Sequence, residues 1–346
     1  MMNAYIHDIL TQPAALRFLA DQISLETLAA LKQRIEDGEF DRIILSGMGA
    51  SYYAAYPTYL QLAILPIPVM IVNAAELVNY LPGLTGPRTL LWLNSQSGRS
   101  AELLHLVEKL VITPVAAVVA CVNDPESPLA KGADYCLPIY AGEESTVSVK
   151  TYTNMLAVNL MAALVLTGKS EMPQLKMDLL ETADKMQAML DTHRDNQEWL
   201  AKAIENIETF FFLGRGASMA AVWTGSLINK EAARCSFEGM NAADFRHGPL
   251  EMVRAGVGAF IFAGDLTSYT LNRQLGVEIQ QHGGSVIWLD AEQNPELSTF
   301  LLPDVPELFR PLVEVIPMQL LTLIMAEKKG IAPGVFHIVG KITQVE

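Results

Sequence analysis

Short apolar runs alternate with longer stretches of helical periodicity along the chain. Apolar residues recur every three or four positions from Ala14 to Glu36, which predicts an N-terminal helical segment. Phe40–Leu45 predicts a buried strand, a glycine-rich turn follows it, and helical spacing resumes over Tyr52–Leu65. Further short apolar runs follow at Pro68–Val72, Thr89–Leu93, Val115–Val122 and Tyr135–Pro138. Strands that alternate with helices in this way indicate βαβ units and a parallel sheet.

The same strand-and-turn pattern occurs a second time. Phe40–Ser51 and Ile207–Ser218 each consist of an apolar run followed by a glycine turn. Four residues of the turn are identical at an offset of 167, so that Gly47, Gly49, Ala50 and Ser51 match Gly214, Gly216, Ala217 and Ser218. An offset near half the chain length, after matching apolar runs, predicts a tandem duplication.

A chain of 346 residues is long enough for two domains of this kind. We expect an α/β fold with two tandem doubly wound domains, each a three-layer sandwich of flavodoxin or Rossmann type around a parallel sheet. The expected boundaries are a helical segment at residues 1–35, a first domain at 36–171, a helical linker at 172–206, a second domain at 207–330 and a C-terminal tail at 331–346.

Composition narrows the class of protein further. The chain is 51% hydrophobic and 18% charged, which excludes a disordered protein. Its apolar runs are shorter than the ~20 residues of a membrane span, and its first residues lack the pattern of a secretory signal. An odd set of cysteines without metal-ligand spacing (Cys121, Cys136 and Cys235) predicts reduced thiols in a cytoplasmic protein.

The net charge of −14 argues against nucleic acid and anionic membranes as partners. It also means that local donors must hold any anionic ligand, because the overall field repels it.

The glycine turns suggest either a small-molecule site or a purely structural role. A dinucleotide site is disfavoured, because Tyr52 stands where that motif has glycine or alanine, and the second strand ends at Asn73 rather than at an acidic residue. A turn that lines a small-molecule site is the preferred interpretation.

Hydroxyl groups cluster after the strand at Thr89–Leu93. Asn94-Ser95-Gln96-Ser97-Gly98-Arg99-Ser100 leads directly into an amphipathic helix. Serine hydroxyls and backbone amides at a helix N-terminus favour an anion, although Ser100 taken alone is better explained as a helix cap. The helix dipole contributes only ~0.3–1 kcal/mol, so several donors must converge to hold a phosphate.

Two residues of the second half are candidates for acid–base chemistry. Glu231 lies near the end of a helical stretch that begins at Met219, and a loop-like segment from Ser236 to Phe245 follows. His247 precedes Gly248-Pro249, which predicts a rigid turn; a core role is less natural there than usual, but the pattern alone leaves a functional role of His247 open. Most glutamates are solvated, so the residue pattern alone leaves the role of Glu231 open.

Together these motifs resemble the sugar isomerase (SIS) domain family. Residues 40–346 are similar to the isomerase half of glucosamine-6-phosphate synthase and to the stand-alone fructosamine-6-phosphate (Amadori) deglycases. Gly49-Ala50-Ser51 matches the family's Gly-Thr-Ser turn, and Ser95-Gln96-Ser97-Gly98 with Ser100 matches its phosphate loop. Ser148 matches the serine of its Val-Ala-Ser-Thr-Lys motif, and Glu231 and His247 keep the family's spacing of 16.

The resemblance implies a mechanism without a metal or an organic cofactor. Glu231 would move a proton between C1 and C2 of an open-chain sugar phosphate, and such catalysis typically gives ~10²–10⁴-fold. His247, donated across a homodimer interface, would assist ring opening, and Lys341 would contact the sugar or form an imine. Phosphate and sugar would be bound by Gly49, Ser51, Ser95, Gln96, Ser97, Ser100 and Ser148.

Departures from the family pattern qualify the expected reaction. The chain opens without the catalytic cysteine of a glutaminase domain, so no glutaminase activity is expected. Ile228 replaces a second active-site lysine of the synthases, which argues against plain aldose–ketose isomerisation. Arg99 replaces a glutamate of the phosphate loop. Arg99 and His337 are candidates to recognise a substrate carboxylate, although an ordinary surface position is the preferred interpretation of each.

We therefore expect a phosphosugar hydrolase, a deglycase that splits a 6-phosphorylated sugar–amine adduct into a hexose 6-phosphate and a free amine or amino acid. An amino-sugar-phosphate deaminase or an aldose–ketose isomerase is the enzymatic alternative, and a non-catalytic sugar-phosphate-binding module is the third.

Overall fold

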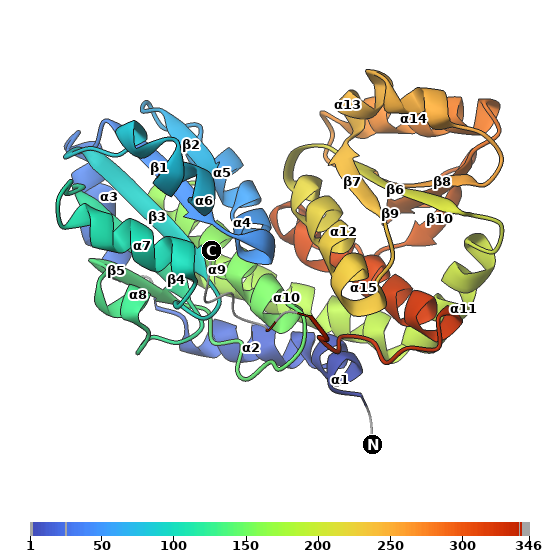
Figure 1. Ribbon diagram of the computed structural model, residues 1–346, viewed down its shortest axis with the longest axis horizontal. Helices are drawn as coiled ribbons and strands as arrows, with labels where there is room; N and C mark the ends of the chain where they lie inside the picture. The colour runs from blue at the N-terminus through green and yellow to red at the C-terminus, as the bar shows by residue number, and fades with distance from the viewer. Residues whose placement is uncertain (1–2, 25, 339, 341–346) are drawn as a thin grey trace. The chain divides into compact units, whose positions relative to one another are not determined.

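The computed structural model describes residues 3–24, 26–338 and 340 (Figure 1). By its internal contacts the chain divides into two compact units. We call Ala14–Leu180 the N-terminal unit; residue 337 is grouped with it. The C-terminal unit consists of residues 3–13 and Glu181–Phe336. Each unit contains one five-stranded sheet in which all strand pairs are parallel.

The N-terminal unit forms the sheet order β2-β1-β3-β4-β5. Its strands are β1 (Arg42–Gly47), β2 (Val69–Asn73), β3 (Thr89–Ser95), β4 (Ala117–Val122) and β5 (Tyr135–Pro138). All residues of β3 and β4 are buried, as expected for central strands of a parallel sheet that is covered on both faces.

Helices cover both faces of this sheet. One face packs against α6, α7 and α8 in a core cluster that includes Ile44, Leu91 and Leu103. On the other face α9 contacts β4, β5 and the helices α3, α4 and α5. The helices of the unit are α2 (Gln12–Gln22), α3 (Thr27–Glu36), α4 (Gly49–Ala54), α5 (Tyr56–Leu62), α6 (Ala74–Asn79), the short η1 (Pro82–Leu84), α7 (Ala101–Leu110), α8 (Pro128–Lys131), α9 (Lys150–Leu166) and, across the unit boundary, α10 (Met172–Asp191).

The C-terminal unit repeats this design with the sheet order β10-β9-β8-β6-β7. Its strands are β6 (Thr209–Gly214), β7 (Glu238–Asn241), β8 (Val257–Phe262), β9 (Ser285–Asp290) and β10 (Ser298–Leu301). A core cluster with Phe211, Phe245 and Leu275 lies between the sheet and α13 and α14. On the other face α12 packs against β6, β7 and α15. The helices are α1 (Ala4–Leu10), α11 (His193–Ala203), η2 (Gly216–Ser218), α12 (Met219–Ala233), α13 (Ala242–Arg246), η3 (Pro249–Met252), α14 (Tyr269–Gln281), η4 (Glu307–Phe309) and α15 (Arg310–Lys328).

The duplication predicted from the sequence agrees with the strand positions. β6 begins and ends 167 residues after β1, the offset of the glycine turns (209 − 42 and 214 − 47). Numbered within its own repeat, each sheet has the order 2-1-3-4-5, so the two units share one topology.

Two expectations about helices and one about a loop were wrong. The periodic stretch Ala14–Glu36 is interrupted, since α2 ends at Gln22 and α3 begins at Thr27. The helix expected over Tyr52–Leu65 is split into α4 and α5, because Pro57 lies in the first turn of a new helix. The segment expected as a loop from Ser236 to Phe245 contains β7 and most of α13.

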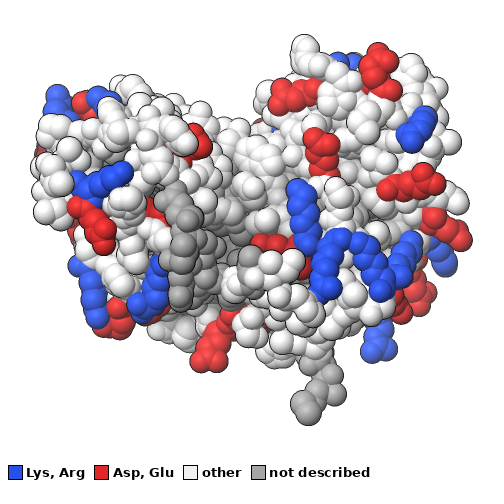
Figure 2. Space-filling model, viewed as in Figure 1, with Lys and Arg blue, Asp and Glu red and all other residues white. Residues whose placement is uncertain are grey.

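One helix of the described residues is long and apolar enough to span a membrane. It is Glu307–Lys328, and 83% of its most apolar window is buried inside the protein, as in a core helix. On the visible face in Figure 2, Lys and Arg side chains are interspersed with Asp and Glu, with large uncharged areas between them.

Candidate active site

The carboxyl ends of β1 and β3 lie side by side in the N-terminal unit, where Gly47 pairs with Asn94. Asn94 is fully buried, and its Nδ2 donates to the carbonyl oxygen of Ser46 at 3.1 Å. Asn159 of α9 donates in turn to Asn94 Oδ1 at 2.7 Å. A side chain at Gly47 would meet the Asn94 carbonyl oxygen at 2.8 Å, so glycine permits this close approach. The turns after β1 and β3 are therefore held at one place, where doubly wound sheets bind ligands.

Ser95 and Ser100 bring their hydroxyls together in the turn after β3. Their Oγ atoms lie 3.1 Å apart, and Ser95 Oγ also accepts the amide of Gly98 at 3.1 Å. Gly98 has φ +61°, and a Cβ there would lie 2.0 Å from Ser127 Oγ. The turn is thus a tightly fitted structure that requires glycine at this position.

The N-terminus of α7 lacks a side-chain cap. Ser100 occupies the N-cap position with extended backbone, but its hydroxyl makes no capping hydrogen bond. Ser97 Oγ accepts the amide of Arg99 at 3.1 Å. Glu102 in the first turn is only 5% exposed, and a carboxylate at this position disfavours an anion bound here. Free helix amides together with several hydroxyls are the donor set that a phosphate requires.

Arg99 is engaged by another side chain. Its Nη2 forms an ion pair with Asp124 Oδ2 at 2.7 Å, and both side chains are partly exposed. The cation nearest to the turn in the sequence therefore has a carboxylate partner in the same unit.

Gly49, Ser51 and Ser148 belong to the same unit as Ser95–Ser100. Gly49 has φ +52° and begins α4 directly after β1, which places half-buried Ser51 in the first turn of that helix. Ser148 is half-buried and lies two residues before α9, a helix that contacts α4. The N-terminus of α9 is occupied by Glu144, whose Oε1 accepts the amide of Val149 at 2.9 Å. An anion at Ser148 would therefore compete with an internal carboxylate.

A cavity of about 610 Å³ adjoins the turn through Gln96. Asn123 links its walls, because its amide donates to Gln96 O at 3.1 Å and its Nδ2 donates to Gly142 O at 2.9 Å. The lining residues are Phe18, Gln96, Asn123, Tyr140, Gly142, Glu143, Glu144 and Ser145. Its volume is that of a small-molecule site.

Glu231 lies in the last turn of α12 in the C-terminal unit and is half-buried. Neighbouring Lys230 points back along the helix, and its Nζ donates to Ser226 Oγ at 2.9 Å. The helix ends at Arg234, which has φ +51°. Gly225 brings α12 against α15, since a Cβ there would lie 2.6 Å from Met318 Cγ. Packing of α12 against α15 thus fixes the helix that carries Glu231.

The start of the C-terminal tail lies beside this helix end. The amide of Gly334 donates to the carbonyl oxygen of Ala232 at 3.2 Å, and Pro333 O accepts from Asn3 Nδ2 at 3.3 Å. Lys341, predicted to contact the sugar, lies outside the described residues.

His247 is the C-cap residue of α13, and its side chain is exposed. Its amide donates to Asp244 O at 2.9 Å, and Gly248 follows with φ +147°. No hydrogen bond joins its ring to another described residue. The turn predicted from His247-Gly248-Pro249 is present, and the imidazole ring of His247 is accessible to solvent.

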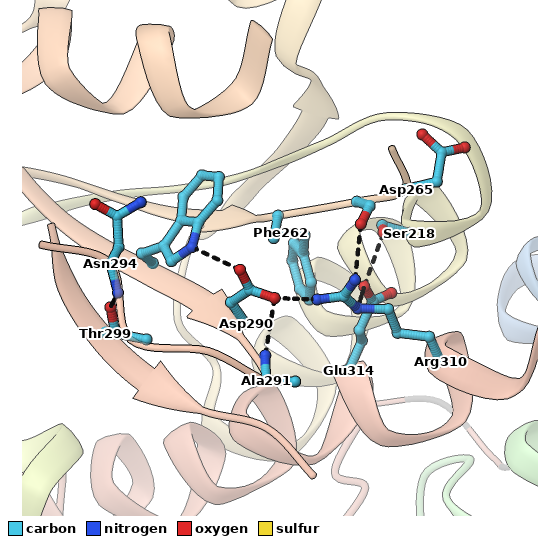
Figure 3. A network of polar contacts seen from close by, with 12 residues as sticks. Ser218, Phe262, Asp265, Asp290, Ala291, Asn294, Thr299, Arg310 and Glu314 are labelled. Carbon is cyan, nitrogen blue, oxygen red and sulfur yellow. Dashed lines mark hydrogen bonds and ion pairs between the residues drawn. The ribbon is translucent and has the colours of Figure 1, made fainter. Parts of the chain in front are cut away.

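The corresponding edge of the C-terminal sheet has different chemistry (Figure 3). Strand register makes Phe262 the counterpart of Asn94, so that Ala263, Gly264 and Asp265 stand where the first repeat has Ser95, Gln96 and Ser97. Ser218, the counterpart of Ser51, donates to Glu314 Oε1 at 2.8 Å. Asp265 thus stands where the first repeat has Ser97, and the hydroxyl of Ser218 is bonded to a buried carboxylate.

Arg310 and Glu314 of α15 are the polar centre of this second edge. Arg310 pairs with Asp290, donates to Gly264 O at 2.8 Å and lies 3.6 Å from Glu314 Oε1. Burial raises the pKa of Glu314 to about 7, although Arg310 and Ser218 oppose the shift. Sequence reasoning missed this network; the match of Ser218 to Ser51 was its only signal.

Comparison with known proteins agrees with the fold. Residues 39–165, which include β1, the Ser95–Ser100 turn and most of α9, match the SIS domain model. Residues 39–165 are a SIS domain. Among the described residues, no group of three or more His, Cys, Asp or Glu side chains is arranged to hold a metal ion.

Its relatives include aminotransferases that are longer than this chain. It is 30% identical to the glutamine–fructose-6-phosphate aminotransferase (isomerizing) of Thermococcus kodakarensis, over 99% of this chain and 58% of the relative. The chain spans about half the length of the curated relatives that it matches. It resembles their isomerase half.

Solved structures show the same fold at low sequence identity. The C-terminal domain of glucosamine-fructose-6-phosphate aminotransferase from Francisella tularensis matches with a TM-score of 0.84 and 21% identity, over 96% of this chain and 98% of that one. Tagatose-6-phosphate ketose/aldose isomerase from Escherichia coli matches with a TM-score of 0.78 and 18% identity, over 95% of this chain and 94% of that one.

Proposed function

We propose that this SIS-domain protein is a phosphosugar enzyme that removes the amine from a 6-phosphorylated sugar–amine adduct. The observation that carries the proposal is the difference between the two repeats. The Ser95–Ser100 turn offers hydroxyls and an uncapped helix N-terminus, whereas its counterpart after β8 offers Asp265 beside a buried carboxylate network. This difference supports a phosphate site at the Ser95–Ser100 turn.

Glu231 acts as the base in the proposed reaction. It takes a proton from C1 of the open-chain 1-amino-2-keto sugar, which gives a 1,2-enaminol, exchanges this proton with solvent and then delivers a proton to C2. The product is an imine between C1 and the amine nitrogen, and addition of water releases the free amine and a hexose 6-phosphate. His247, contributed by a partner subunit, opens the sugar ring, and Lys341 contacts the sugar oxygens.

Ile228 favours removal of the amine over plain isomerisation. It is fully buried in α12, so no cation occupies the position where the synthase pattern has a lysine. Deamination of a 2-amino sugar phosphate moves the proton in the opposite direction, from C2 to C1, and releases ammonia when water adds to the C2 imine. Measuring ammonia and amine in the same reaction separates the two activities.

A Glu231→Gln variant tests the proposal. Purified protein is incubated with phosphorylated Amadori compounds, and hexose 6-phosphate is followed by mass spectrometry. Glu231→Gln should lose turnover by at least ~10²-fold while its Kd for hexose 6-phosphate stays within a factor of about two. Glu205→Gln, a change at an exposed glutamate of the same unit, is the matched control. Turnover by Glu231→Gln at the wild-type rate would exclude Glu231 as the base.

A further inference from the structure

The cavity beside Gln96 has a wall with an unpaired negative charge. The side chain of Glu143 is exposed and its carboxylate forms no ion pair with a described residue, although its backbone oxygen accepts Lys150 Nζ at 2.8 Å. Glu144 uses both carboxylate oxygens on the start of α9, where Oε2 accepts the hydroxyl of Thr151 at 2.6 Å. Among the described residues that line the cavity there is no Lys, Arg or His.

Two aromatic rings form another wall. Phe18 and Tyr140 meet edge to face, with ring centroids 6.3 Å apart, and Phe18 is 52% exposed. Tyr140 has φ +49°, a conformation that is unfavourable for a bulky residue and is held by the Asn123 contact to Ala141 N at 2.9 Å. Aromatic faces next to a carboxylate attract an organic cation and offer nothing to a second carboxylate.

We propose that this cavity receives the amine half of the substrate, and that it selects adducts whose amine carries a second positive charge over adducts whose amine carries a carboxylate. The inference rests on the proposed function for the nature of the substrate. It replaces the expectation that Arg99 recognises a substrate carboxylate, because Arg99 is paired with Asp124.

The position of the cavity supports this assignment, in addition to its charge. Gln96 belongs both to the turn proposed to hold the phosphate and to the cavity lining, so the cavity adjoins the proposed phosphate site. The residues named here all belong to the N-terminal unit, so the inference does not depend on Glu231.

Three synthetic ligands of matched length test the proposal. They are fructosamine 6-phosphates that carry a 4-aminobutyl, an n-butyl or a 3-carboxypropyl group on nitrogen. Dissociation constants are measured by calorimetry at low and high salt, and turnover of each is measured by mass spectrometry. We expect the aminobutyl adduct to bind about 5-fold more tightly than the butyl adduct and the carboxypropyl adduct to bind more weakly, with differences that shrink at high salt.

Variants assign the selectivity to the cavity. Glu143→Gln should bring the three affinities within a factor of about two, and Phe18→Leu should weaken only the aminobutyl adduct. Glu108→Gln, a change at an exposed glutamate of α7 outside the cavity, should leave the ranking unchanged.

Equal affinities in the wild type, or tighter binding of the carboxypropyl adduct, would overturn the inference. Absence of turnover with all three compounds would count against the proposed function alone, because the ranking of affinities still decides the nature of the cavity.

Discussion

Replacement of Glu314 by Gln should make the C-terminal unit more stable at alkaline pH. Glu314 is fully buried in α15, and its Oε2 has no hydrogen-bond partner among the described residues. Burial raises its pKa from an ordinary value of 4.5 to about 7. The folded state therefore binds a proton between these two values that the unfolded state has released, and stability falls as the pH rises through this window.

The size of the effect follows from the shift. Each pKa unit corresponds to 1.36 kcal/mol, so ionised Glu314 costs the folded state about 3 kcal/mol above pH 7 and little below pH 4.5. Glutamine has the shape of the neutral acid and still accepts the hydrogen bond from Ser218. The stability of Glu314→Gln relative to wild type should therefore rise by about 2–3 kcal/mol between pH 5 and pH 8.

Urea unfolding at several pH values provides the assay. Tryptophan fluorescence follows the C-terminal unit, which contains Trp199, Trp223 and Trp288 of the four tryptophans. Glu307→Gln, which changes an exposed glutamate just before α15, serves as the control and should parallel wild type. A constant difference between Glu314→Gln and wild type over this pH range would show that Glu314 is not the buried acid described here.

Three further substitutions test the Ser95–Ser100 turn and the packing of the helix that carries Glu231. Gly98→Ala should destabilise the N-terminal unit by more than the ~1–2 kcal/mol that a left-handed backbone costs, because its Cβ overlaps Ser127 Oγ, and calorimetry should show weaker hexose 6-phosphate binding. Gly225→Ala should cost about 1–3 kcal/mol in urea unfolding and lower turnover, since its Cβ forces Met318 away from α12. Ser100→Ala should raise the Kd for hexose 6-phosphate about 10-fold and leave that for the unphosphorylated hexose unchanged, because it removes a hydroxyl donor from the phosphate site.

Controls and contrary results are available for each of these. Gly38 has a left-handed backbone and nothing near the position of a Cβ. Gly38→Ala should therefore lower the free energy of unfolding by less than Gly98→Ala does, and equal losses would refute the overlap with Ser127. Adding Met318→Ala to Gly225→Ala should restore part of the lost free energy of unfolding, and the absence of any gain would contradict the packing of Gly225 against Met318. Ser236→Ala, at an exposed serine, should bind like wild type, and a Ser100→Ala variant that does the same would remove Ser100 from the phosphate site.

The sequence predicted the strands that carry strong apolar runs, and the repeat predicted a second set. β3 and β4 are buried along their whole length, so nearly every residue contributes to the signal. β7 was missed because Glu238–Asn241 has a single large apolar side chain, Met240, in a four-residue strand. A closer use of the repeat would have found it: Asn73 and Asn241 end equivalent strands and cap the helices that follow, accepting from Ala75 N at 3.0 Å and Ala243 N at 2.8 Å.

At the site, sequence patterns reveal residues that are contiguous in the chain but not contacts between distant residues. Ser95–Ser100 is contiguous, so a local pattern revealed it. The network of Ser218, Asp290, Arg310 and Glu314 joins three elements that are far apart in the chain, and only the fold brings them together. The pairing of Arg99 with Asp124 is also non-local, which is why Arg99 was expected to be available to a ligand.

Proton exchange at the sugar carbons tests the central claim most directly. Wild-type protein is incubated in D₂O with a fructosamine 6-phosphate, and the C1 and C2 positions of recovered substrate and product are examined by NMR. We predict deuterium at these carbons with wild type, none with Glu231→Gln, and none when the substrate lacks its phosphate. Products that form without any deuterium at C1 or C2 would contradict proton transfer by a base acting on a phosphate-anchored sugar.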